Sequence, residues 1–312
     1  MKLGSITAQR GAALLTAMVI VTLVATMAAA MVWQQWRAVQ VEAAERGRMQ
    51  SAWILTGALD WARMILREDS RSGGADHLGE PWAVPLAEAR LSTFLAVDKD
   101  NTDEAPEAFL SGSITDAQSR YNLHNLYEEG TGKLVPAELK VLGRLCEAAG
   151  LSADVADRLA SALAAASTAS GDAALMPQSV AQLVWLGLDA ETVRRLAPYV
   201  VLLPVRTPVN LNTASAEVIA ASVTGLEIGD AERLVQVRQR TPFKTLAAAQ
   251  QNLPPTIMLS DRQASVSSRF FEVQGQLRLA DRVLQERSLV ERRNPDVVAI
   301  RRQRVNLNDP GG

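Results

Sequence analysis

The sequence predicts an α+β fold, in which a long N-terminal helix leads into an antiparallel sheet domain that carries an inserted all-helical domain. Three observations predict it. No proline occurs between Ala12 and Pro81, and the first part of that stretch is almost entirely apolar. An alanine-rich helical pattern runs from about Val135 to Gln251, and strand-like alternation follows it. The order helix, strands, helical block, strands is typical of an insertion in a sheet domain.

Residues 12–70 form the predicted helix. Residues 11–36 contain no Asp, Glu, Lys or Arg, and a helix of that length extends about 39 Å, more than a hydrocarbon core of about 30 Å. We therefore expect one transmembrane segment. Lys2 and Arg10 precede it, which favours a cytoplasmic N-terminus. Beyond it the pattern turns amphipathic, and helical spacing predicts a buried face made of Ile54, Ala58, Trp61 and Ile65.

Two stretches flank the helical block and are expected to share the sheet domain. Near the start of residues 71–130, the run Ser72-Gly73-Gly74 is expected to end the helix. The rest of this stretch indicates loops and short strands. One alternation in this stretch is formed by Trp82, Val84 and Leu86. Residues 256–312 return to strand-like alternation and predict a terminal antiparallel meander over residues 269–277, 282–287 and 297–301.

The helical block, residues 131–255, contains an internal repeat. Gly150, Gly187 and Gly225 each stand between two helical segments at nearly equal spacing, and a leucine follows each glycine nine positions later. Glycine suits the left-handed turn that closes a helix. The repeat predicts stacked helical hairpins that resemble helix-hairpin-helix units, and chance similarity in an alanine-rich region is the alternative.

The segment Pro208–Ala214 is the most specific pattern outside the N-terminal helix. Asn212 or Thr213 is expected to cap a helix that begins near Ala214, because side-chain oxygens at that position accept from free amides of the first turn. Glu217 would lie in this first turn, where the helix dipole favours a negative charge.

The hairpin that follows, residues 225–230, raises the question of DNA binding. In DNA-binding helix-hairpin-helix units the hairpin amides meet a phosphate at a helix N-terminus. Here Glu227 and Asp230 place two carboxylates where that phosphate would approach, and they would repel it. We therefore expect no nucleic-acid partner, and a membrane-anchored helix-hairpin-helix DNA-binding protein is kept as the alternative.

The N-terminal leader has its glycine before the apolar run, so a cut at Gly11 would leave the hydrophobic helix on the mature protein. This layout resembles the leader of type IV pilins and pseudopilins. The resemblance implies a leader of residues 1–11, removed by a prepilin peptidase, and a mature N-terminus at Ala12. An ordinary signal peptide cut near residues 28–30 would instead release a soluble periplasmic protein, and an uncleaved anchor is the other alternative.

The fifth mature position would be Thr16, where most of that superfamily carries Glu. A hydrophobic residue or threonine there is typical of the large K-class minor pseudopilins of type II secretion systems, the general secretion pathway protein K family. Members of that class also carry runs similar to Asp116–Leu123 and Pro208–Ala214, and an aromatic pair like Phe270-Phe271 before a strand. The chain therefore resembles this family over essentially its whole length.

The resemblance implies a pilin-like α/β domain with a helical insertion, carried on a single-pass inner-membrane helix with the C-terminal body in the periplasm. It implies a place at the tip of the pseudopilus, where such a protein initiates assembly and supports export of folded proteins across the outer membrane. The implied partners are minor pseudopilins of the I and J classes, the pseudopilus shaft and the prepilin peptidase.

The acidic segment Asp98–Glu104 suggests calcium, which the family resemblance also implies for the pilin-like domain. As an EF-hand loop it fails, because Asp103 stands where glycine is needed and Phe109 where the bidentate Glu should be. An irregular site is therefore the hypothesis, with Asp98, Asp100 and Asp103 as candidate ligands. A solvated acidic loop without metal is the alternative.

Composition argues against several other classes. A net charge of −2 gives no general electrostatic reason to bind nucleic acid. The single cysteine, Cys146, is expected to be buried on a helix face and cannot form an internal disulfide. His77 and His124 are far apart in the sequence and lack a cysteine partner, so zinc is not expected. No hydrolase or phosphate-loop setting occurs, so we expect a structural protein and no enzyme.

Overall fold

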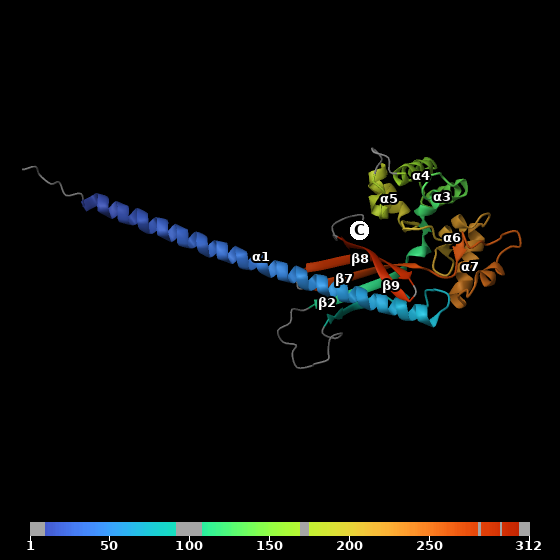
Figure 1. Cartoon of the computed structure of the whole chain (residues 1–312), viewed down its shortest axis with the longest axis horizontal. Coiled ribbons are helices and arrows are strands. Elements are labelled where there is room, and N and C mark those ends of the chain that lie inside the picture. Colours follow the sequence, from blue (N-terminus) through green and yellow to red (C-terminus); the bar gives the residue numbers. More distant parts are fainter. Residues whose placement is uncertain (1–9, 92–107, 169–174, 280–281, 294, 306–312) are drawn as a thin grey trace, which may run out of the picture. The chain divides into compact units, whose positions relative to one another are not determined.

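The computed structural model describes residues 10–91, 108–168, 175–279, 282–293 and 295–305. The chain divides into two compact units, Met1–Ile54 and Leu55–Gly312. Helix α1, Arg10–Ser72, runs through both (Figure 1, blue). It ends where the sequence predicted, because Gly73 and Gly74 follow it with φ angles of 67° and 136°.

The first unit is described only by its part of α1. Every apolar side chain of α1 from Leu14 to Val41 is exposed. Within the described residues, α1 is the one helix long and apolar enough to cross a membrane. This unit therefore presents an exposed apolar surface that no other described residue covers.

The second unit contains a five-stranded antiparallel sheet with the strand order β1-β2-β7-β8-β9 (Figure 1). Its strands are β1 (Leu86–Arg90), β2 (Ala108–Asp116), β7 (Phe270–Leu279), β8 (Arg282–Arg293) and β9 (Asp296–Val305). The last three form the expected terminal meander. Of the predicted alternation Trp82, Val84 and Leu86, only Leu86 lies in a strand, β1, since Pro81–Ala83 forms a 3-10 turn with proline at its start.

The end of α1 packs on one face of this sheet through Leu55, Leu59, Ala62 and Leu66, all buried. The predicted face was wrong by one residue, and Trp61 is 45% exposed. Both rows have the same helical spacing, but Leu59, Ala62 and Leu66 are buried in the core formed by Trp82, Phe271, Val273, Val290 and Val297. Of the predicted row, Ile65 packs at the edge of this core and is only partly buried. Gly275 permits the close approach, since a Cβ there would stand 3.3 Å from the Leu55 Cδ2.

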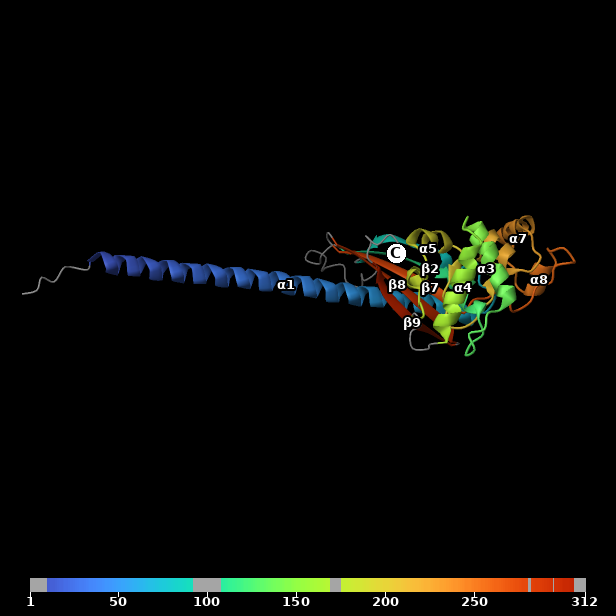
Figure 2. The same cartoon turned by 90° about the horizontal axis from the view of Figure 1, so that it is seen from above.

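The remaining elements lie between β2 and β7 in the sequence, and Figure 2 shows the labelled helices α3, α4, α5, α7 and α8 close together. The helical elements are η2 (Ala117–Ser119), η3 (Leu123–Leu126), α3 (Pro136–Ala148), α4 (Asp154–Ser167), η4 (Val180–Leu186), α5 (Ala190–Leu196), α6 (Ala216–Ser222), α7 (Ile228–Arg240) and α8 (Leu246–Gln250). Two short parallel pairs interrupt them, β3 (Tyr121–Asn122) with β4 (Val200–Val201), and β5 (Val209–Asn210) with β6 (Ala264–Ser265). These helices enclose a large apolar core of their own.

The three repeated glycines adopt the predicted left-handed conformation. Their φ angles are 65° at Gly150, 84° at Gly187 and 77° at Gly225, and each lies between two helical elements. The leucines that follow them by nine positions are fully buried, namely Leu159, Leu196 and Leu234. The repeat therefore has a common local geometry, and a leucine of the second helix enters the core in each case.

Candidate functional site

The predicted processing site lies in the first turns of α1. Gly11 and Ala12 are both helical, and Thr16 is exposed with its Oγ1 donating to the backbone oxygen of Ala12 at 2.8 Å. Thr22 and Thr26 donate in the same way to carbonyls of the preceding turn. These three hydroxyls are thus hydrogen-bonded within the helix, which lowers the cost of placing them in an apolar environment.

A buried carboxylate, Asp116, connects three segments of the body. Its Oδ2 accepts from Asn210 Nδ2 at 2.9 Å, from Thr213 Oγ1 at 2.6 Å and from Ser268 Oγ at 2.6 Å. Its Oδ1 accepts from the Gln118 backbone N–H at 2.8 Å. Burial raises the pKa of Asp116, and the hydrogen bonds from Ser268 and Thr213 act in the opposite direction.

Two asparagines extend this buried junction. The side chain of Asn122 donates to Val205 O at 2.7 Å and accepts from the Leu203 backbone N–H at 3.1 Å. Asn125 exchanges two hydrogen bonds with the backbone of Thr207, at 2.9 Å and 3.1 Å. The two runs on which the family resemblance depends are in contact through Asp116, which binds the side chains of Asn210 and Thr213, and through Gln118, which donates to the Pro208 carbonyl. The two asparagines add contacts to the neighbouring segment 203–207.

The predicted helix cap was wrong. Helix α6 begins at Ala216, and Ser215 caps it by accepting from the Val218 N–H. Asn212 instead exchanges two 2.9 Å hydrogen bonds with the backbone of Phe243, and Thr213 binds Asp116. Both residues serve tertiary contacts rather than a local cap. Glu217 lies in the first turn of α6, as expected.

Carboxylates also gather at the C-terminal end of α1. Ligand oxygens of Asp69, Asp76 and Glu80 lie within 4.8 Å of one another, and Arg292 forms ion pairs with the first two. Burial raises the pKa of both Asp69 and Asp76, while Arg292 lowers it. Carboxylate oxygens suit a hard divalent cation, but such an ion would share two of these groups with Arg292. The predicted calcium ligands Asp98, Asp100 and Asp103 lie outside the described residues.

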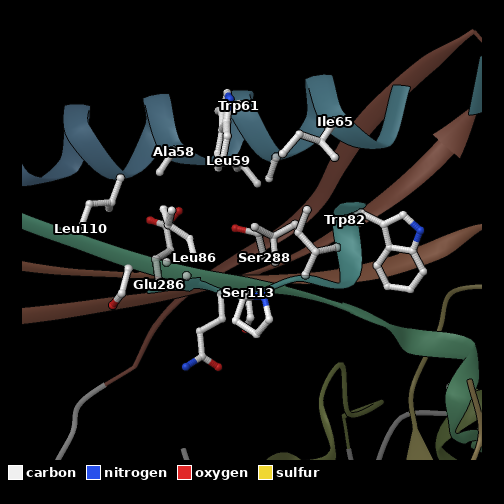
Figure 3. A pocket seen from close by; sticks show the side chains of 18 of the residues that line it. Ala58, Leu59, Trp61, Ile65, Trp82, Leu86, Leu110, Ser113, Glu286 and Ser288 are labelled. Carbon is white, nitrogen blue, oxygen red and sulfur yellow. The ribbon is translucent and has the colours of Figure 1, made fainter. Parts of the chain in front are cut away.

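An apolar cavity of about 250 Å³ lies between α1 and the sheet (Figure 3). Trp61 and Ile65 reach it from α1, and Trp82 and Leu86 come from the segment that leads into β1. Glu286 and Ser288 supply polar atoms from β8. No arrangement of nucleophile, base and acid lines this cavity among the described residues.

Cys146 lies in α3 with no exposed surface. Burial raises its pKa to about 11, so the thiolate needed for disulfide exchange is scarce at neutral pH. Its position favours the buried, small hydrophobic role predicted from the sequence.

Two family models match the chain, and both describe protein K of the type II secretion system. They cover residues 119–205 and 209–265, the segments that contain the buried junction and the helical block. Curated proteins of the same description extend the match to most of the chain. The protein from Pseudomonas aeruginosa is 29% identical and aligns with 88% of this chain and 86% of its own. The protein from Pectobacterium carotovorum is 28% identical, and the alignment covers 95% of this chain and 96% of that protein.

The family models and the curated relatives together support the type II secretion system protein K family for this chain. Protein K in this family is a minor pseudopilin of type II secretion, and so is this chain. The fold is similar to a chain of the crystal structure of the GspK–GspI–GspJ complex from enterotoxigenic Escherichia coli, with a TM-score of 0.63 at 18% identity. That match covers 84% of this chain and 98% of the other. The comparisons give no support to the alternative of a DNA-binding protein.

Proposed function

We propose that this chain forms the tip of the type II secretion pseudopilus, together with minor pseudopilins of the I and J classes, above the pseudopilus shaft. The similarity to a chain of the GspK–GspI–GspJ complex supports these partners. At the tip the protein would initiate assembly and so support export of folded proteins across the outer membrane. Its role would be structural, without catalysis.

Two observations carry the proposal: the exposed apolar surface of α1 in the first unit, and the bulk of the second unit. A helix whose side chains from Leu14 to Val41 are all exposed needs lipid or sister helices around it. The block of helices between β2 and β7 adds a second large core to the body. We expect that bulk to clash in a repeating shaft and to fit only at its end.

Thr16 supports the first position in the filament. In other pseudopilins the Glu at this position can neutralise the N-terminal amine of an adjacent subunit within lipid, where an unpaired charge costs several kcal/mol. Thr16 supplies no charge, and its hydroxyl donates to Ala12 O in its own helix. A subunit with no amine above it needs no such partner.

Three further parts of the proposal concern organisation. We place the body in the periplasm and the single span in the inner membrane. The left-handed glycines and the buried leucines support three helix-hairpin-helix-like units in an inserted domain of about residues 131–255. Calcium at Asp98, Asp100 and Asp103 stays a prediction.

The experiment that tests processing is N-terminal sequencing of the protein extracted from membranes. We expect the mature chain to begin at Ala12, because cleavage after Gly11 leaves α1 attached to the body. A mature N-terminus near Met31, on a protein free in the periplasm, would contradict the proposal. An N-terminus at Met1 would indicate an uncleaved anchor and equally exclude processing by a prepilin peptidase.

A further inference from the structure

A second cleft, of about 350 Å³, lies at the buried junction, where the segment 206–208 meets the segment 267–269. Its described lining residues include Arg206, Arg269 and Arg292 and no carboxylate. Arg292 already pairs with Asp69 and Asp76, so the positive charge that a ligand could meet in this cleft comes from Arg206 and Arg269. This cleft shares no lining residue with the cavity beside α1.

Each of the two more exposed arginines is held from one side. Arg269 pairs with Glu291, and Arg206 lies 3.7 Å from a carboxylate oxygen of Glu138. Neither carboxylate lines the cleft. The side chains of Arg206 and Arg269 are 45% and 53% exposed. Because a guanidinium has five N–H donors, such pairs leave donors for a further acceptor.

Neutral groups fix the shape of the cleft and add to its donors. Gln118 donates to Pro208 O at 3.1 Å and accepts from the Arg269 backbone N–H at 2.6 Å, so it holds the two walls together. The Thr207 hydroxyl oxygen accepts from Asn122 Nδ2 at 3.1 Å, which leaves its own hydrogen to donate. The lining is thus rich in donors and prefers an anionic ligand.

We infer that this cleft binds an acidic segment of a partner protein, with Arg206 and Arg269 each holding a side-chain carboxylate. Guanidinium and carboxylate match in a bidentate geometry that a single point charge does not provide. A cleft of about 350 Å³ is also roughly ten times the volume of one water molecule, more than a single small anion fills. The inference goes beyond the proposed place at the tip, and it stands or fails independently of the N-terminal processing.

The test uses the full chain in detergent micelles and a fluorescein-labelled hexaglutamate peptide, with binding followed by fluorescence anisotropy. Hexaglutamine is the matched neutral probe. The test variant combines Arg206→Gln and Arg269→Gln. Both carboxylates left behind keep a partner, since Glu291 also pairs with Arg293 and Glu138 accepts from the Tyr121 hydroxyl. The variant is therefore expected to fold, which far-ultraviolet circular dichroism checks.

The control variant combines Arg158→Gln and Arg194→Gln, which remove the same charge from exposed helix pairs away from the cleft. We expect hexaglutamate to bind the native chain, the test variant to bind it at least tenfold more weakly, and the control to change affinity less than twofold. Equal weakening in both variants, or equal binding of hexaglutamine, would overturn the inference. Absence of hexaglutamate binding, with calorimetry showing that inorganic phosphate binds, would also overturn it and would assign the cleft to a free anion.

Discussion

At the residue scale, the most informative side chain is Asp116, a buried carboxylate held by neutral donors. It accepts from Thr213, Ser268, Asn210 and the backbone of Gln118, and it is 1% exposed. Removing a donor from a buried acceptor costs about 1–3 kcal/mol of stability, because water cannot reach the acceptor to replace the lost hydrogen bond. The free energy of unfolding should therefore depend on each donor around this group.

We predict that Thr213→Val lowers the free energy of unfolding by about 1–3 kcal/mol, because it removes the 2.6 Å hydrogen bond to Asp116 while keeping the side-chain volume. Thr192→Val is the matched control, since the Thr192 hydroxyl makes a 2.6 Å hydrogen bond to Asp189 on an exposed surface. That change should cost less than about 1 kcal/mol. Urea unfolding of both variants in micelles measures the difference, and equal losses would contradict the role given to burial.

The sequence predicted the burial of Cys146 but misjudged Asn212 and Thr213. It located both as polar residues before a helix, where capping is the common role. Their actual partners, Phe243 and Asp116, lie 31 and 97 positions away. Nothing in local spacing distinguishes a cap from such a tertiary contact, so the sequence could find the junction residues but not what they bind.

At the element scale, glycine conformation was predictable and the orientation of α1 was not. Gly150, Gly187 and Gly225 stand at helix ends, where a left-handed residue is common, and all three adopt it. Along α1 the apolar arc is wide enough that two rows, one residue apart, fit the same helical spacing. The row through Leu55 and Leu59 is the buried one, because those side chains meet the sheet.

We predict that Gly187→Ala lowers the free energy of unfolding by about 1–2 kcal/mol, the cost of a left-handed alanine. No atom lies within 4 Å of the position that the new Cβ would take, so the effect isolates backbone strain. Gly143→Ala, inside α3 and equally open, should instead stabilise by up to about 1 kcal/mol. Opposite signs in urea unfolding are expected, and a neutral Gly187→Ala would argue against the strained turn.

At the scale of the whole molecule, the order of helix, strands, helical block and strands was readable from composition and periodicity. The clustering of Asp69 and Asp76 around Arg292 was not, since Arg292 lies 223 and 216 positions further along the chain. Only the folded sheet brings β8 to the end of α1. Assembly properties belong to this scale too, because they depend on how α1 meets other chains.

We predict that cells carrying a Thr16→Val variant export proteins normally, because the Thr16 hydroxyl donates within its own helix. Thr16→Glu should be tolerated or slightly harmful, since a subunit at the first position has no amine to neutralise. Thr22→Val, which removes a similar internal hydrogen bond, is the control. The measurement is the amount of exported protein in cells lacking the native chain. Loss of export with Thr16→Val alone would refute the reasoning from charge.

The pairing of β2 with β7 has a consequence for how the chain matures after synthesis. Residue Asp116 pairs with Phe271, so the central strands cannot meet until most of the polypeptide has been made. The helices in between make their contacts over shorter separations and can fold earlier, since closing a long loop is entropically costly. The helices between β2 and β7 would then already be compact when β7 is made. A compact block shortens the separation that β2 and β7 must close in order to pair.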